Sequence, residues 1–294
     1  MGRGAGVVVA GIILSITGIA IAGVCAKPAR DEFKKQDKYK EGEITLKDSS
    51  KISIEVAAGT VNLHHSDTTT SYVKYNILEH YEVKYDEEDN ELKLRNDWIY
   101  SLLPFSWIHE NKSVVDIYLT DKEYDAYLEL SAGHFNIEED FTFSSLTMEV
   151  SAGDLNFNGN ITVNHDATFR VSAGNMNLNK RVIVNNNLNL KVSAGDMDIN
   201  YVEANKTDIR ISAGDIDLKK IKSNDIKFKA SAGDLKMNIL GNKDDYTITM
   251  DRSAGTIHID GEKIRDDYEK KGGTNKLDGD ISAGNATINF ISED

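Results

Sequence analysis

The sequence predicts an all-β protein, a β-solenoid of about 20-residue coils that follows one N-terminal transmembrane helix. Three observations support this fold. A Ser-Ala-Gly motif returns at a nearly constant interval, apolar and polar residues alternate on both sides of it, and an uninterrupted apolar run lies near the N-terminus. The helical period of about 3.6 residues is not found after residue 46, apart from the short charged stretch at 262–271.

The apolar run covers residues 7–26, and no charged residue interrupts it. Its twenty residues would span about 30 Å as a helix, which is the thickness of a bilayer core. Residues 1–26 are therefore predicted to be a membrane anchor with a short tail. One alternative is a cleaved signal peptide ending near Cys25, although such peptides usually have apolar cores of about 7–15 residues. The other is a lipid on Cys25, for which the preceding Val24 fits poorly.

Residues 27–46 are charged and are predicted to form a juxtamembrane linker. More basic residues follow the anchor than precede it, and the positive-inside rule would then keep the large domain in the cytoplasm. Long domains, however, cross membranes largely regardless of charge. We expect a single-pass protein of the cell membrane with its solenoid outside the cytoplasm. The basic residues after the anchor are Lys27, Arg30, Lys34, Lys35, Lys38 and Lys40.

The Ser-Ala-Gly motif marks the repeats of a domain predicted to cover residues 47–294. From Gly133 to Gly233 five steps span 100 residues, a mean of 20. A constant interval predicts coils that stack in parallel, about 4.8 Å apart. An antiparallel sandwich is the alternative, but it gives no reason for one motif at a fixed spacing. The predicted corner glycines are Gly59, Gly133, Gly153, Gly174, Gly195, Gly214, Gly233, Gly255 and Gly284.

Apolar residues lie two apart on both sides of each corner, as in MEVSAGDLNF at 148–157. A period of two predicts strands, and the phase slips by one residue at the glycine. We expect a bend there, with glycine in backbone angles that a Cβ would forbid and with the preceding alanine in a narrow interior. Many repeats add a third apolar pair, such as Ile161 and Val163. Each coil should therefore hold about three short strands joined by polar turns.

Several stretches resemble the bacterial putative-adhesin family, a β-strand-repeat family of unknown function that is also grouped with Toastrack domains. They are KISIEVAAGTVNL at 51–63, VVDIYLTDKEYDAYLELSAGHFNI at 114–137, the serial SAGD coils and GDISAGNATINF at 279–290. Together they cover about residues 48–291. The resemblance implies a right-handed, single-stranded β-helix tethered to the membrane of Gram-positive bacteria, and relatives that accompany envelope-stress signalling systems. Thr120 stands where the family usually has a proline.

Charge and composition exclude several classes of function. The net charge of -14 and the pI near 5.0 oppose binding to nucleic acid. Cys25 is the single cysteine, so disulfides and cysteine metal sites are excluded from the repeat domain. Zinc-protease, phosphate-loop and nucleophile-elbow motifs are not found. We therefore expect no enzymatic activity, no cofactor and no obligatory metal.

Polar residues recur at fixed places in the repeats. Stacked coils would align Asp196, Asp215 and Asp234, and such carboxylates can bind calcium or accept backbone N–H groups in turns. Two like charges about 4.8 Å apart repel by only about 1 kcal/mol in water, so turns without a cation are expected. Asparagines such as those at 185–187 are likewise expected in turns, with amide ladders or sugar contacts as alternatives. The adjacent His64 and His65 should point to opposite faces of a strand, which disfavours chelation.

The stretch DWIYSLLPFSWIHE at 97–110 is unusually aromatic. It is predicted either to cap an open end of the solenoid or to dock on a partner or the membrane interface. The candidate partner-contact residues are Trp98, Tyr100, Phe105 and Trp107.

Together these features predict a non-catalytic, membrane-anchored binding or scaffold module of the cell envelope. Its partners would be the membrane, through residues 7–26, and a protein or glycan of unknown identity. One alternative is a regulatory partner of a membrane sensor system. Another is a polysaccharide-active enzyme built on a parallel β-helix, which would need carboxylates that converge in a groove. The carboxylates here recur at turns instead.

Overall fold

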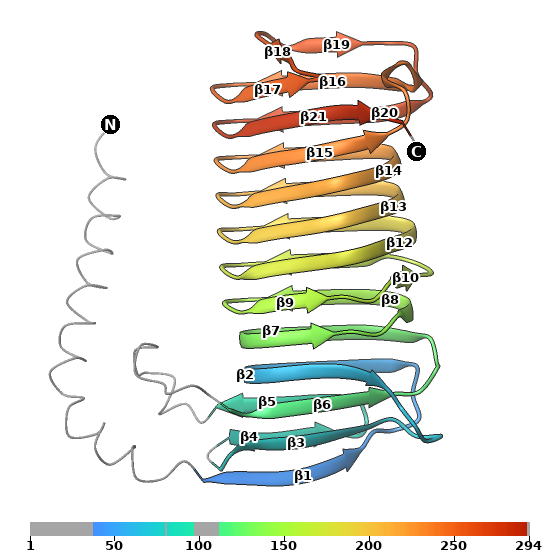
Figure 1. Ribbon diagram of the computed structural model, residues 1–294, viewed down its shortest axis with the longest axis vertical. Coiled ribbons are helices and arrows are strands. Elements are labelled where there is room, and N and C mark those ends of the chain that lie inside the picture. Colours follow the sequence, from blue (N-terminus) through green and yellow to red (C-terminus); the bar gives the residue numbers. More distant parts are fainter. Residues whose placement is uncertain (1–37, 80, 97–111, 293–294) are drawn as a thin grey trace, which may run out of the picture.

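The computed structural model describes residues 38–79, 81–96 and 112–292. It confirms an all-β fold in which coils stack into one column (Figure 1), and the described strands join in a single 21-stranded sheet. No helix in this part of the chain is long and apolar enough to span a bilayer. The predicted anchor at 7–26 lies outside the described residues.

The most regular coils show three segments each, as predicted. β12 (Asn175–Val192), β13 (Asp196–Ile211) and β14 (Asp215–Ala230) each extend over nearly a whole coil. Every second residue is buried within a segment, and parallel pairing of β12 with β13 shifts register twice, after Leu178 and after Val184. These two shifts and the Ser-Ala-Gly corner divide the coil of β12 into three sides, 175–178, 181–184 and 187–192, of which the last is the longest.

The side that follows the corner is called the post-corner face. Its neighbouring strands are β6 (Val114–Leu119), the second halves of β2 (Lys51–His65) and β7 (Tyr124–Ile137), β9 (Asp154–Phe157), the starts of β12, β13 and β14, then β15 (Asp234–Leu240), β21 (Asn285–Ile291) and β17 (Thr256–Ile259).

The side that precedes the corner is called the pre-corner face. Its neighbouring strands are β5 (Glu91–Asn96), the first halves of β2 and β7, the second half of β8 (Phe141–Val150), β11 (Ala167–Val171), the ends of β12, β13 and β14, then β20 (Asn275–Ile281) and β16 (Tyr246–Arg252). The third side, between the two register shifts, includes the start of β8, β10 (Ile161–Val163) and the middles of β12, β13 and β14.

The core fills the inside of the column along its whole length. Its largest fully buried side chains include five phenylalanines, and burying one such side chain stabilises the fold by roughly 1.5–3 kcal/mol. The inward positions repeat from coil to coil, so equivalent apolar side chains stack on one another. The five phenylalanines are Phe135, Phe143, Phe157, Phe169 and Phe228.

The coils do not follow one another in sequence order at the C-terminal end. After β15 the chain passes through the short helical turn η3 (Lys243–Asp245) into β16 and β17. The last pair, β20 and β21, then returns and lies between two earlier coils (Figure 1). β20 pairs with β14 on one side and β16 on the other, and β21 pairs with β15 and β17. The final repeat is therefore an inner coil.

Antiparallel strands close both ends of the column. At the N-terminal end β1 (Tyr39–Thr45) pairs with β3 (Tyr72–Leu78), β3 pairs with β6, and β4 (Tyr81–Asp86) pairs with β5. At the other end β18 (Glu262–Ile264) covers β17 and β19 (Tyr268–Lys270) covers β16. Strands therefore cover the terminal coils. The predicted aromatic cap at 97–110 lies outside the described residues.

The predicted linker at 27–46 is wrong at its end, because residues 39–45 form β1 and belong to the domain. The sequence did not predict β1, because the stretch YKEGEIT contains few apolar residues. Only Ile44 of this strand packs against the core, and it is partly buried. Backbone pairing with β3 holds the strand in place.

Candidate binding surface

The corner glycines form a column, but for a different reason from the one predicted. Only Gly59 and Gly133 of the nine have positive φ, 125° and 110°. The others are required because successive corners touch. A Cβ placed on Gly214 would lie 1.9 Å from the carbonyl oxygen of Gly195 and 2.6 Å from Val192 Cγ1. Glycine is therefore needed for the close approach of two coils.

The alanines of the corners are also placed differently from the prediction. In the coil of Gly153 the glycine is buried and Ala152 is exposed. In this coil the buried position after Val150 is therefore Gly153, three residues later. The same exposure is found at Ala173, Ala194, Ala213, Ala232, Ala254 and Ala283. These methyl groups form part of the outer edge of the column.

The aspartates that follow the corners align as predicted, and two of their carboxylates accept hydrogen bonds from the backbone. Asp196, Asp215 and Asp234 pair in register on β13, β14 and β15. Asp215 Oδ1 accepts the backbone N–H of Asp234 at 2.9 Å, and Asp234 Oδ1 accepts the backbone N–H of Asn285 at 3.1 Å. Asp215 and Asp234 therefore bind backbone N–H groups as predicted, but those of the neighbouring coil and not of their own turn.

Asparagine side chains form ladders between coils, an arrangement that the sequence left as an alternative to turns. The side-chain amide of Asn177 donates to Asn156 Oδ1 at 2.9 Å. Asn179 donates in the same way to Asn158 at 2.7 Å, and Asn289 to Asn238 at 2.9 Å. These bonds follow the stacking direction and fix the register of neighbouring coils.

The adjacent histidines, expected on opposite faces, both lie near Glu139. His64 Nδ1 is 3.5 Å from Oε1 of Glu139, and His65 Nε2 is 3.9 Å from its Oε2. β2 ends at His65, so the alternation of a strand stops there. Asp116 lies 3.5 Å from His64 Nε2, and Asp121 lies 2.9 Å from His65 Nδ1. Among the residues described, no group of three or more His, Cys, Asp or Glu side chains is placed to hold a metal ion.

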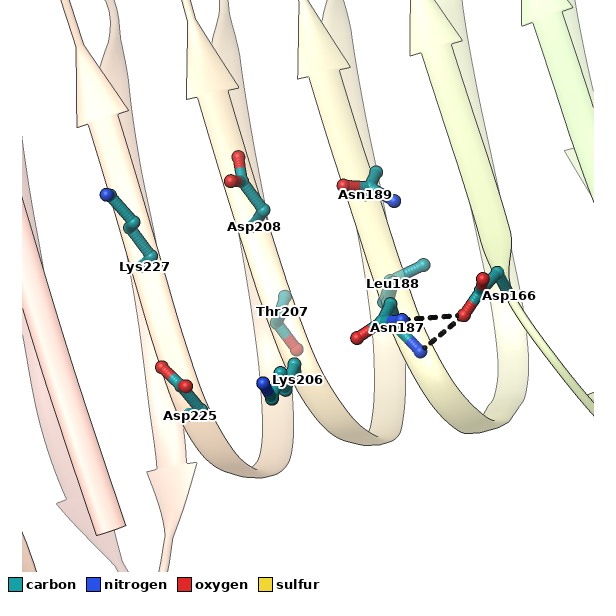
Figure 2. Close-up of a pocket in the computed structure, with 9 residues that line it drawn as sticks. All are labelled: Asp166, Asn187, Leu188, Asn189, Lys206, Thr207, Asp208, Asp225 and Lys227. Carbon is teal, nitrogen blue, oxygen red and sulfur yellow. Dashed lines mark hydrogen bonds between the residues drawn. The ribbon is translucent and has the colours of Figure 1, made fainter.

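A shallow groove of about 370 Å³ crosses several coils at the bend before the pre-corner face. Two of its lining residues, Asp166 and Asn187, are joined by hydrogen bonds (Figure 2). The backbone N–H and the side-chain amide of Asn187 both donate to Asp166 Oδ1, at 3.0 and 2.8 Å. The buried hydroxyl of Thr207 donates to Ser223 Oγ at 3.1 Å. The groove thus presents aligned residues from successive coils.

Outside the groove, the carboxylate of Asp140, which precedes β8, makes the stability of the fold sensitive to acid. Asp140 accepts the backbone N–H of Asn160 at 2.7 Å and its side-chain amide at 2.9 Å. These bonds, the backbone one above all, lower the pKa of Asp140 below its ordinary value of 3.8. A lowered pKa means that the ionised carboxylate favours the folded state. This stabilisation is complete above the unfolded pKa and is lost as pH falls through the lower folded pKa.

Asp140→Asn should therefore lower the thermal midpoint at neutral pH and weaken its decline with acid. The comparison is a series of melting curves of wild type and variant between about pH 7 and about pH 3. Asp244→Asn is the control, because the exposed carboxylate of Asp244 lies 3.3 Å from Lys270 Nζ and does not accept a backbone N–H group of a neighbouring coil. Parallel pH curves for wild type and Asp140→Asn would contradict the role given to Asp140.

The four aromatic candidates Trp98, Tyr100, Phe105 and Trp107 lie outside the described residues. The segment that contains them joins β5 to Ser113, whose carbonyl oxygen would lie 2.7 Å from a Cβ on Gly59. Ser113 therefore continues the column of corners. In this coil β5 lies on the pre-corner face and β6 on the post-corner face.

Three solved structures resemble this chain in fold. A putative adhesin from Parabacteroides merdae is 13% identical, covers 86% of this chain and 96% of its own, and has a TM-score of 0.57. A putative adhesin from Bacteroides fragilis is 15% identical, covers 87% and 98%, and has a TM-score of 0.51. A putative lipid binding protein from Parabacteroides distasonis is 13% identical, covers 86% and 97%, and has a TM-score of 0.52. At these identities the likeness shows the fold alone.

No curated protein matches the chain. The family model described as Toastrack DUF4097 matches residues 49–290, which include all nine corner glycines and the strands from β2 to β20. The match confirms the resemblance seen in the repeats. This chain belongs to the Toastrack DUF4097 family.

Proposed function

We propose that this protein is a non-catalytic binding or scaffold module, anchored in the membrane by residues 7–26 and displayed outside the cytoplasm. The arrangement of its exposed side chains in straight columns carries the proposal. Each coil adds one more copy of the same outward positions, and the resulting surface suits an extended partner. The names of the similar structures, two adhesins and one lipid-binding protein, support a binding role.

The use of the carboxylates favours binding over hydrolysis. A glycosidase needs two carboxyl groups that face each other across a bond, about 5–9.5 Å apart. Asp215 and Asp234 instead accept backbone N–H groups of the next coil. Their role is to hold the column together. A link to envelope-stress signalling, which the family resemblance implies, is part of the same proposal.

The side of the membrane can be tested by thiol labelling in intact cells. Lys220 is exposed on β14, so Lys220→Cys in a Cys25→Ala background offers one accessible thiol. We expect a membrane-impermeant thiol reagent to label it without breaking the cells. Ser223→Cys is the matched control, because Ser223 is only 2% exposed on the same strand and should label poorly in either location.

Labelling of Lys220→Cys only after the membrane is broken would contradict display outside the cell. The positive-inside rule would then describe the orientation, and a regulatory partner of a membrane sensor would become the better function.

A further inference from the structure

The pre-corner face carries a straight column of four cations, called the basic column: Arg170, Lys191, Arg210 and Lys229. Parallel pairing places Arg170 beside Lys191, Lys191 beside Arg210, and Arg210 beside Lys229. Neighbouring strands are about 4.8 Å apart, so the column extends for roughly 14 Å. It stands out in a chain whose net charge is -14.

The face around the basic column is positive, whereas the opposite face of the same coils is negative. Residues 166–171, 187–192, 206–211 and 225–230 contain six cations and three anions. The facing post-corner segments, 175–178, 196–199, 215–218 and 234–237, contain five aspartates and one lysine. Over these four coils the two faces therefore have charges of opposite sign.

Three cations of the basic column have well-exposed side chains, and Lys191 is half-buried. The exposed fraction of the side chain is 43% for Arg170, 58% for Arg210 and 59% for Lys229. Each of these three pairs with one carboxylate, and exposed pairs of this kind contribute only about 0–1 kcal/mol. Lys191 forms no ion pair with any residue that the structure describes. An anionic ligand that binds these cations more strongly than the carboxylates do can therefore displace the carboxylates and contact all four cations.

The basic column keeps like charges together. Two unit charges about 4.8 Å apart repel by about 1 kcal/mol in water. On the same face the column of Lys206, Asp225 and Lys276 alternates in sign and avoids this repulsion. An anionic ligand along the basic column would relieve it.

A second column supplies hydroxyl groups beside the cations. Ser172, Ser193, Ser212 and Ser231 follow the four cations by two residues, so they share the outward direction, and all four are exposed. Their backbone N–H groups bind the preceding coil, for example Ser193 N–H to Val171 O at 2.9 Å. Their hydroxyls bond to no side chain or carbonyl in the described part of the chain. Each coil thus offers one cation and one free hydroxyl donor.

We infer that the basic column and its serines bind an extended anionic polymer that lies along the stacking direction. The inference names a ligand class for the proposed binding function and rests on that function. A polymer fits better than a small anion, because one cation and one hydroxyl recur in each of four coils with no enclosed pocket around them. The negative net charge repels such a polymer at long range, but at physiological salt charges are screened beyond about 8 Å.

The test uses long-chain inorganic polyphosphate and the full-length protein in a non-ionic detergent. Binding is measured by the fluorescence anisotropy of labelled polyphosphate. We expect the wild type to bind, with an affinity that falls as salt rises, and orthophosphate to compete weakly. Replacing Arg170, Lys191, Arg210 and Lys229 together by glutamine should weaken binding at least about tenfold.

The matched control removes four exposed lysines outside the basic column. It replaces Lys51, Lys180, Lys220 and Lys263 by glutamine, which changes the net charge by the same amount. This variant should bind within about twofold of wild type. Equal loss in both variants would show a general charge effect and overturn the inference. Because all eight residues are at the surface, melting curves should confirm that both variants fold.

Further arms separate the sources of the anionic group. Binding of a polyuronate, also lost in the basic-column variant, would support the inference with carboxylates in place of phosphates. Binding to phosphatidylglycerol vesicles without binding to either polymer would overturn it in favour of a membrane surface. Salt-sensitive dimers that disappear in the basic-column variant, without polymer binding, would overturn it in favour of a second copy of the chain. Thiol labelling in cells is unaffected by any of these results, so the proposed display outside the cell is judged separately.

Discussion

Gly214→Ala is expected to destabilise the protein by about 3–5 kcal/mol, a large fraction of the roughly 5–15 kcal/mol that stabilises a typical domain. The new methyl group would lie 1.9 Å from the carbonyl oxygen of Gly195. That atom belongs to the backbone of the neighbouring coil, so no side chain can move aside to relieve the clash. Chemical denaturation, read by circular dichroism, measures the change.

Two nearby substitutions test the reason for this loss. Gly241 has φ of +131° and nothing within 4 Å of its Cβ position, so Gly241→Ala should cost only about 1 kcal/mol of backbone strain. Ala213 is exposed next to Gly214, and Ala213→Ser should change stability by less than about 0.5 kcal/mol. If Gly214→Ala costs no more than Gly241→Ala, contact between coils does not explain the regular spacing of the corner glycines.

Removal of residues 275–294 is expected to abolish cooperative folding. The deletion takes away β20 and β21, which pair with earlier coils on both sides. Leu277, Ile281 and Ile288 are fully buried, and each contributes roughly 1.5–3 kcal/mol. The strands β14 and β15 would each lose the partner on one side, and unpaired strand edges promote aggregation.

Size-exclusion chromatography and thermal melting of the truncated chain measure this effect. Deletion of residues 293 and 294 alone is the control, and it should behave as wild type. A truncated protein that stays monomeric and melts at the wild-type temperature would show that the inner position of β20 and β21 adds nothing to stability.

The repeat and the strands could be predicted because local signals determine them. Alternation of apolar and polar residues indicates a strand, and a Ser-Ala-Gly corner every 19 to 21 residues between Gly133 and Gly233 indicates a coil. The spatial order of the last coils could not be predicted, because the corners at Gly255 and Gly284 have the same motif and suit either position. The role of the glycines was mistaken because a sequence does not distinguish an unusual φ from a close contact between coils.

The alignment of exposed residues in columns could be predicted from the sequence only in part. The aspartates after the corners sit next to the motif, so their alignment could be read directly. The cations of the basic column are separated by 21, 19 and 19 residues, and their common line depends on how each coil is paired. Glu139 and the two histidines are more than 70 residues apart, and only folding brings them together.

The inner position of the last coil also determines which part of the native protein unfolds locally first. Chain ends usually fray first and exchange their amide hydrogens fastest. Here the amides of β20 and β21 are shielded by a coil on each side, while β18 and β19 form the outer layer. Local opening should therefore begin in residues 256–274, and the C-terminal strands should exchange as slowly as the middle of the column.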